Sequence, residues 1–160
     1  MQHLVEPLQF LKDIHENGVR YLLMGRQAII AYGGPVQTMD YDIYVDKAEK
    51  NIDLLLKIAE NYELYPSISK AEIKKHYKFK LENNFAIDIF CFKHFSVGKR
   101  EKLSFNELYE RRNVFKGETG LEINLPSIDD LIELKRLGSR PKDIEDIKYL
   151  QGLKQLKKKG

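Results

Sequence analysis

Three aspartates stand in two short stretches of the sequence that otherwise have the composition of β-strands. Asp40 and Asp42 lie in the run Met39–Val45, and Asp88 is an isolated acid within the apolar run Phe85–Phe92. Side chains alternate across a strand, so Asp40 and Asp42 are expected on the same face with α-carbons about 7 Å apart. Without a cation such a pair is repulsive, and an acid in an apolar strand is costly to bury unless something pairs with it.

Carboxylates that converge in this way suit the hard cations Mg²⁺ and Mn²⁺, which use a few carboxylates together with phosphates and water. Two such ions can hold both the attacking and the leaving oxygen of a phosphoryl or nucleotidyl transfer. We therefore predict that Asp40, Asp42 and Asp88 form a catalytic metal site. An Asp-x-Asp pair alone also occurs at surface turns and helix caps, and that alternative stays open. Asp46 is left out of the site because a role as a helix cap explains it.

A second candidate feature is the turn Met24-Gly25-Arg26-Gln27-Ala28, which lies between a predicted strand and a predicted short helix. Free backbone N–H groups at a helix start attract phosphate, and glycine lets the backbone come close to a ligand. Arg26 could add a positive charge to that contact. A tight turn chosen only for its geometry is the alternative interpretation.

The elements that must position these residues alternate between helix and strand. Helices are predicted over Leu4–Ile14, Gln27–Tyr32, the segment after Asp46, Phe105–Arg112, Ser127–Leu137 and the segment from Pro141; strands are predicted over Val19–Met24, Met39–Val45, Tyr77–Leu81, Phe85–Phe92, Val114–Lys116 and Leu121–Leu125. Capping boxes are expected at Asp46 with Glu49 and at Ser127 with Asp130. The pattern predicts an α+β (mixed α/β) fold, a mixed β-sheet with helices packed on one side and at both chain ends.

Length and composition are those of an ordinary globular chain. With 160 residues and 42% hydrophobic residues, one domain spanning residues 1–160 is expected. The net charge of +3 is mild, and part of it lies in a basic tail, about residues 154–160, expected to be frayed. The single cysteine, Cys91, excludes an intrachain disulfide. No apolar run approaches the ~20 residues that cross a bilayer, and no secretory signal opens the chain, so a cytoplasmic location is expected.

Together these motifs resemble the nucleotidyltransferase superfamily, which has the DNA polymerase beta-like fold. The family pattern is a strand, a Gly-Gly or Gly-Ser turn, a short helix, an Asp-x-Asp strand and a third Asp on a later strand. The stretches that match it are Tyr21–Ala28, Gln37–Asp46 and Phe85–Phe90. A second block, Leu125–Lys135 followed by Arg140–Ile147, resembles the C-terminal region of small prokaryotic nucleotidyltransferases. Some of those are the toxins of abortive-infection type toxin–antitoxin pairs.

The resemblance implies a nucleotidyltransferase that depends on Mg²⁺ or Mn²⁺ and takes a nucleoside triphosphate such as ATP as donor. The residues it implies are Asp40, Asp42 and Asp88 for the metal and the chemistry, and Gly25, Arg26, Gln27 and Lys135 for the nucleotide. Asp143 or Asp146 would help to hold Lys135. The acceptor hydroxyl could belong to RNA, a protein or a small molecule, and an antitoxin partner is possible.

One residue departs from the family pattern. Arg26 stands where the family has a small residue that leaves room for the triphosphate. This departure keeps a second hypothesis open, in which the fold is catalytically degenerate and serves as a nucleotide-binding or partner-binding module. A third hypothesis, a nucleic-acid binder driven by charge alone, is disfavoured by the mild net charge and by the position of the lysines in the tail.

Overall fold

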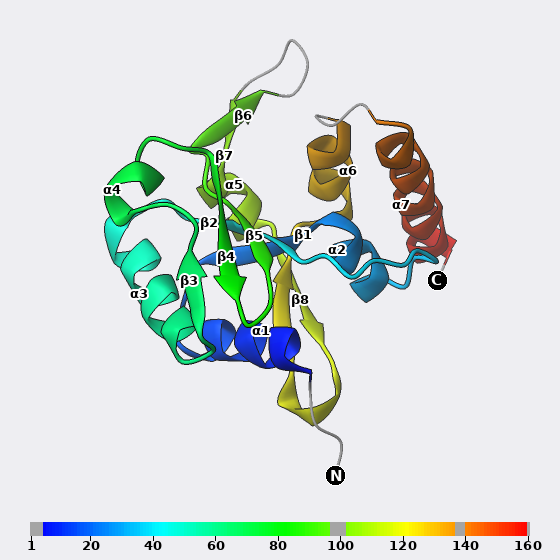
Figure 1. The fold of residues 1–160 in the computed structure, drawn as a ribbon. Coiled ribbons are helices and arrows are strands. Elements are labelled where there is room, and N and C mark those ends of the chain that lie inside the picture. Colours follow the sequence, from blue (N-terminus) through cyan, green and yellow to red (C-terminus); the bar gives the residue numbers. More distant parts are fainter. Residues whose placement is uncertain (1–4, 97–101, 137–139, 160) are drawn as a thin grey trace.

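The fold centres on a mixed β-sheet (Figure 1). The computed structural model describes residues 5–96, 102–136 and 140–159. The sheet has five strands in the order β1 (Tyr21–Met24), β2 (Asp42–Val45), β5 (Ile87–Phe90), β4 (Lys78–Asn83) and β3 (Leu64–Pro66). Strands β2 and β5 are parallel, and the other neighbouring pairs are antiparallel. The predicted α+β class with a mixed sheet is therefore confirmed.

Helices and two small hairpins surround this sheet. The helices are α1 (Glu6–Glu16), α2 (Gly25–Ala31), α3 (Glu49–Glu60), α4 (Lys70–Ile73), α5 (Phe105–Glu110), α6 (Ile128–Arg136) and α7 (Pro141–Lys159), with a 3-10 turn η1 (Glu118–Gly120). Strands β6 (His94–Ser96) and β7 (Lys102–Ser104) pair with each other, as do β8 (Asn113–Lys116) and β9 (Glu122–Leu125). In Figure 1, α6 and α7 lie side by side and apart from the sheet, with α2 beneath them.

Alternation along the central strands gives the sheet two apolar faces. Odd-numbered residues of β1 and β2, such as Leu23 and Ile43, are buried in one core cluster with residues of α1 and α3. Even-numbered residues, such as Met24 and Tyr44, form a smaller cluster with Phe105 of α5. Because side chains alternate in a strand, Asp42 shares the second face with Tyr44. Asp42 thus lies on the face of the sheet that carries the smaller apolar cluster.

One of the two predicted helix caps is correct. The hydroxyl of Ser127 accepts a hydrogen bond from the Asp130 N–H at 3.1 Å, as the capping box predicts. The prediction for Asp46 is wrong, since α3 has Ala48 as its N-cap residue with no side-chain cap bond. The Asp46 carboxylate instead accepts from Ala48 N at 3.0 Å and from Arg20 Nε at 2.9 Å. The ion pair with Arg20 outweighs the cap because it brings a full charge.

The predicted strand Met39–Val45 is shorter than expected. It begins at Asp42, because Asp42 pairs with Met24, the last residue of β1, before Gly25 turns the chain into α2. Asp40 therefore precedes the strand instead of sharing its face with Asp42.

Several other predictions about individual elements differ from the structure. Strand β3 and the short helix α4 were not predicted. The basic tail was expected to be frayed, but α7 continues through Lys159. The predicted end of α6 near Leu137 and Gly138 lies outside the described residues. Within the described ranges, no helix combines the length and the apolar character needed to cross a membrane.

Candidate active site

Asp42 and Asp88 are direct neighbours across the parallel pair of strands β2 and β5. Both follow from the local sequence, since each is the acid of an otherwise apolar strand and projects from the face of the sheet that carries the smaller apolar cluster. Burial, and next the nearby charge of Asp88, raise the pKa of Asp42 above its ordinary value of 3.8. Lys78 and Lys135 act in the opposite direction. Burial and the neighbouring carboxylates thus both disfavour the charged form of Asp42, whereas the two lysines favour it.

Asp88 has weak partners. The ammonium groups of Lys78 and Lys80, both on β4, lie 3.8 Å and 3.9 Å from its two carboxylate oxygens. These distances are beyond hydrogen bonding, and in the described part of the chain the buried Oδ1 of Asp88 has no hydrogen-bond partner. A buried carboxylate oxygen without a partner is unfavourable, and a divalent cation would satisfy it.

Asp40 lies close to this pair but is exposed to solvent. Its backbone N–H donates to Thr38 Oγ1 at 3.1 Å, and its charge also raises the pKa of Asp42. Over residues 5–96, 102–136 and 140–159, no three acidic, histidine or cysteine side chains are grouped so that they could hold one metal ion. The metal-binding role of Asp40, Asp42 and Asp88 together remains a prediction.

Gly25 is in direct contact with Asp42. Its φ of +66° is one that side-chain-bearing residues rarely adopt. A Cβ built on Gly25 would lie 2.6 Å from Asp42 Oδ2, closer than any real contact. The predicted glycine turn is thus required both for its backbone conformation and for the approach of the turn to the carboxylate.

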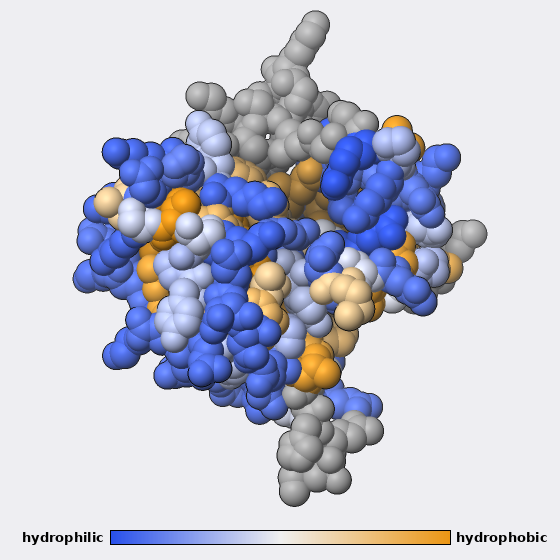
Figure 2. Space-filling view, viewed as in Figure 1, coloured by the Kyte–Doolittle hydropathy of each residue, from blue (hydrophilic) through white to orange (hydrophobic). Residues whose placement is uncertain are grey.

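A cavity of about 180 Å³ opens beside these residues, between the sheet and helices α6 and α7. Its lining consists of Met24, Gly25, Asp42, Phe90, Phe92, Leu131, Leu134, Lys135, Arg140 and Asp143. Figure 2 shows an apolar recess between the sheet and α6, bordered by hydrophilic residues. Apolar walls with a carboxylate on one side and cations on the other are suited to a ligand that carries both a ring and phosphates.

Phe92, which forms one wall of this cavity, is held in place by Tyr44. Tyr44 stacks on Phe92 with ring centroids 4.4 Å apart. Its hydroxyl donates to the Phe92 carbonyl oxygen at 2.8 Å, which holds the chain in place just after β5.

Lys135 reaches this cavity from α6 and is nearly buried. Its ammonium lies 2.9 Å from Asp146 Oδ2 and 3.8 Å from Asp143 Oδ1, both carboxylates of α7. Arg140 also binds Asp143, with Nε at 2.9 Å and Nη2 at 3.2 Å, and these hydrogen bonds lower the pKa of Asp143. The acids of α7 thus hold Lys135 and Arg140 at the edge of the cavity.

The two other residues predicted for the nucleotide do not line this cavity. Arg26 Nε lies 3.2 Å from Asp146 Oδ1, and Arg26 Nη1 donates to the Gln37 carbonyl at 3.4 Å. Gln27 donates to the Thr38 carbonyl at 3.5 Å. Both side chains tie α2 to its surroundings. Because Arg26 is directed to Asp146, it does not occupy the space beside Gly25.

Sequence reasoning missed several residues around the site. Lys78 and Lys80 could have been noticed, because two lysines at alternate positions of a predicted strand must share a face. Arg140 belongs to the block that resembles the family, but no role was predicted for it. Phe90 and Phe92 carry no sequence signal beyond their apolar character.

Solved structures share this fold. TM1012 of Thermotoga maritima, assigned as a nucleotidyltransferase, has a TM-score of 0.60 and 16% identity, over 92% of this chain and 94% of its own. The lincosamide antibiotic adenylyltransferase LnuA, solved with lincomycin, has a TM-score of 0.60 and 16% identity, over 95% and 99%. ANT(2″)-Ia, solved with adenylyl-2″-tobramycin, has a TM-score of 0.60 and 14% identity, over 91% and 88%.

At these identities the likeness concerns the fold. Comparisons with protein-family models and with curated proteins gave no match. The chain therefore has a nucleotidyltransferase fold, as its sequence motifs predict.

Proposed function

We propose that this protein is a metal-dependent nucleotidyltransferase that moves a nucleotidyl group from a nucleoside triphosphate to an acceptor hydroxyl. The observation that carries the proposal is the pairing of Asp42 with Asp88, in which a buried oxygen of Asp88 has no hydrogen bond to any described residue. The pair adjoins Gly25 and a cavity that also contains Lys135. The nucleotidyltransferase fold supports the same conclusion.

The residues present fit a divalent cation. Asp42 and Asp88 would be its ligands, with Asp40 joining them from the preceding loop. Burial and then the charge of Asp88 raise the pKa of Asp42, and a bound cation would counter both effects. Bound Mg²⁺ or Mn²⁺ would supply neutralisation of the triphosphate and a lower pKa of the acceptor hydroxyl. Lys135 would contact the donor phosphates, and Gly25 would let the backbone approach them.

The transfer forms one bond and breaks one. The acceptor oxygen bonds to the α-phosphorus of the donor, the bond from that phosphorus to the bridging oxygen breaks, and pyrophosphate leaves with the electron pair. Asp88 would accept the proton of the acceptor hydroxyl as general base, since its Oδ1 accepts no hydrogen bond from any described residue. Lys135 and Arg140 would offset the charge that develops on the leaving pyrophosphate.

ATP is the proposed donor. LnuA is an adenylyltransferase and ANT(2″)-Ia was solved with an adenylyl product, and both share this fold. An antitoxin partner, implied by the sequence resemblance, stays a prediction.

A transfer assay tests the proposal. The protein is incubated with each α-labelled nucleoside triphosphate, Mg²⁺ or Mn²⁺ and a mixture of RNA, protein and small-molecule acceptors. We expect label transfer by the wild type and by Asp129→Asn, an exposed aspartate outside the site. Asp42→Asn should reduce transfer by at least a hundredfold, the order expected when an electrostatic catalytic group is removed. Absence of transfer from every nucleotide would contradict the proposal.

A nucleotide-binding module without catalysis is the second candidate. The exposed position of Asp40 favours it, because the described residues then contain no ready-made group of three ligands. Stabilisation by a triphosphate without transfer to any acceptor would identify this case.

A further inference from the structure

A second cavity, with a volume of about 250 Å³, lies apart from the candidate active site. Its residues come from α3, α4 and the segments that follow β2 and β5. We call it the lysine pocket, and it is lined by Lys47, Glu49, Ile52, Lys70, Ile73, Lys74 and Lys93. It shares no lining residue with the cavity that contains Asp42. The two isoleucines belong to the larger core cluster, whereas Asp42 lies on the face with the smaller one.

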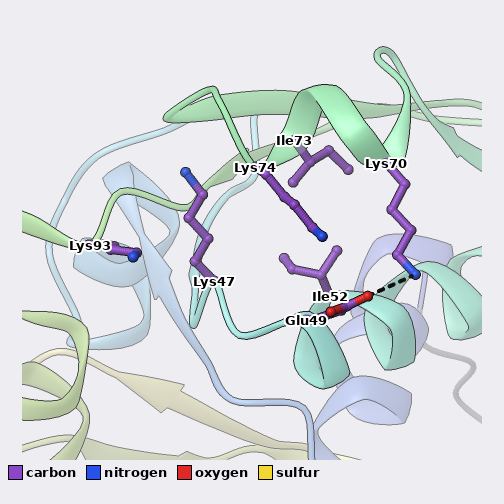
Figure 3. Close-up of a pocket in the computed structure, with 7 residues that line it drawn as sticks. All are labelled: Lys47, Glu49, Ile52, Lys70, Ile73, Lys74 and Lys93. Carbon is purple, nitrogen blue, oxygen red and sulfur yellow. Dashed lines mark ion pairs between the residues drawn. The ribbon is translucent and has the colours of Figure 1, made fainter.

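The floor of the lysine pocket is apolar. Figure 3 shows Ile52 of α3 and Ile73 of α4 facing each other across the space, with the Lys74 side chain ending between them. The two isoleucines are only 4% and 2% exposed, so their positions are fixed by the core behind them. An apolar surface beside charged groups favours a ligand that has an apolar part as well as a charge.

Among the described residues, acids pair with only one of the four lysines. Lys70 pairs with Asp53 and, at 3.9 Å, with Glu49, which is the single carboxylate of the lining. Lys47 donates to the His76 carbonyl at 3.0 Å, and this acceptor is neutral. Because an ammonium group has three N–H donors, that bond leaves Lys47 able to donate to a ligand as well.

Lys74 and Lys93 are exposed, and neither has an ion pair or a hydrogen bond with any residue that the structure describes. With Lys47, they bring three ammonium groups to one hollow without a carboxylate to balance them. Like charges gathered at a cavity repel one another, and its apolar walls strengthen their field. A bound anion would relieve that repulsion.

A phosphate group suits these three lysines better than a carboxylate does. A phosphomonoester carries a charge of about −1.5 to −2 at pH 7 and has three acceptor oxygens, which ammonium groups can reach from different directions. A carboxylate has a single charge. The volume of the pocket is slightly below the range of about 300–1,000 Å³ that is typical of drug-sized ligands. The pocket therefore suits a small molecule, with one phosphate and a short apolar group.

We propose that the lysine pocket binds a small phosphomonoester. The phosphate is held by Lys47, Lys74 and Lys93, and the apolar group lies against Ile52 and Ile73. The inference does not rest on the proposed nucleotidyl transfer, so either can fail without the other.

Isothermal titration calorimetry at constant ionic strength tests the proposal, with phenyl phosphate and inorganic phosphate as probes. The wild type should bind phenyl phosphate roughly tenfold more tightly than inorganic phosphate, the order expected when one face of a ring is buried against apolar side chains. Equal affinity for the two probes would contradict the role of the isoleucine floor.

Two double variants test the lysines. Lys74→Ala/Lys93→Ala should weaken the binding of phenyl phosphate by roughly tenfold or more, because it removes two charge-assisted contacts. The control Lys57→Ala/Lys116→Ala removes the same charge at exposed positions that line neither cavity, and it should bind like the wild type. Thermal unfolding checks that both variants are folded. Equal affinities of the two double variants would overturn the inference.

A third variant excludes binding at the candidate active site, which also contains cations. Arg140→Ala removes one of them and should leave the affinity for phenyl phosphate unchanged. Loss of binding in Arg140→Ala, with none in Lys74→Ala/Lys93→Ala, would place the ligand in the other cavity and overturn the inference.

Methyl NMR of isoleucine-labelled protein locates the ring directly. Phenyl phosphate should shift the methyl resonances of Ile52 and Ile73. The resonance of Ile123, a buried residue of β9 that lines neither cavity, should not move. Unchanged resonances of both pocket isoleucines at saturating phenyl phosphate would contradict the proposed site.

Discussion

Gly25 and Asp42 are in close contact, and each limits the position of the other. The turn can approach the carboxylate only because Gly25 has no Cβ, and the positive φ makes glycine the favoured residue there. From the sequence motif alone, glycine could have been required at this position only for the backbone geometry of a tight turn. The structure adds that the turn and the acid are in contact, which joins the two predicted parts of the site.

Replacing Gly25 with alanine should therefore displace Asp42. Gly18→Ala is the matched control, because Gly18 also has a positive φ of +80° but has open space where its Cβ would lie. Both variants should lose about 1–2 kcal/mol of unfolding free energy from the left-handed backbone. Only Gly25→Ala should lose further stability and abolish label transfer, as urea unfolding and the transfer assay will measure. Equal behaviour of the two variants would contradict the close contact.

The raised pKa of Asp42 gives a second prediction. A carboxyl whose pKa in the folded state lies above its unfolded value of 3.8 binds its proton more tightly in the folded state. The free energy of unfolding therefore falls as the pH rises from 3.8 through the folded pKa. Asp42→Asn removes the ionisable group. In the absence of metal, it should be more stable than the wild type at pH 7 and should lose this advantage below pH 3.8. Urea unfolding at both pH values measures the difference. If the variant were less stable than the wild type at pH 7, burial and the charge of Asp88 would not destabilise the charged form of Asp42.

Among single residues, the sequence could identify Asp42 and Asp88 because an acid in an apolar strand is unusual. It could not place Asp40, since the end of the strand depends on where the partner β1 stops. Nor could it show that Arg26 turns away from the predicted phosphate position, because its partner Asp146 is distant in the chain.

At the scale of elements, helices α2, α6 and α7 are joined by a buried ionic cluster. Asp146 of α7 is fully buried and lies between Lys135 of α6 and Arg26 of α2. Asp143 adds Arg140 to the same group. A charge removed from such a cluster leaves the remaining buried charges less well compensated. The cluster therefore sets the distance between the helices and the cavity that they enclose.

Lys135→Met should lower the free energy of unfolding by about 3–5 kcal/mol, the range for breaking a buried ion pair. Lys154→Met is the control, because Lys154 pairs at 2.6 Å with Asp129, whose side chain is 68% exposed. The control should change stability by less than about 1 kcal/mol. Urea unfolding measures both variants. Similar losses in the two would contradict the buried character of the cluster.

Helix caps and strands were predictable from the sequence where neighbouring residues alone determine them, without a partner distant in the chain. Ser127 has no competing partner for its hydroxyl among the described residues, and its cap is formed as predicted. Asp46 has one, because Arg20 approaches it from the end of another segment. Strand β3 was missed because Leu64–Pro66 has only three residues and depends on pairing with β4. Long-range partners of this kind leave little trace in a short stretch of sequence.

For the whole molecule, a divalent cation and a triphosphate should stabilise the fold together. A ligand at a hundred times its Kd adds about 2.7 kcal/mol to the unfolding free energy. The gain should be larger at pH 8 than at pH 4, because the metal role proposed for Asp42 requires its deprotonated form and its pKa is raised above 3.8. Thermal melting with MgATP at both pH values measures it. Asp42→Asn should lose most of the gain, whereas an equal gain at both pH values would contradict the role of this carboxylate.

The overall arrangement was predictable from the order of motifs, because the family pattern specifies which strands must be neighbours. The pocket bordered by Lys47, Lys70, Lys74 and Lys93 was not. Its residues come from the segments that follow β2 and β5 and from α3 and α4, which are brought together only when the sheet has formed. In the sequence these lysines cannot be distinguished from the many that are simply solvated.

The parallel pairing of β2 with β5 also has a kinetic consequence. The hairpin of β4 and β5 closes over a short loop, but β2 reaches β5 only after α3, β3, α4 and β4 have been traversed. Loop closure over that length is slow relative to local contacts. We therefore expect Asp42 and Asp88 to become neighbours late in folding. Recovery of nucleotide binding during refolding should follow the final phase, after most helical structure has returned.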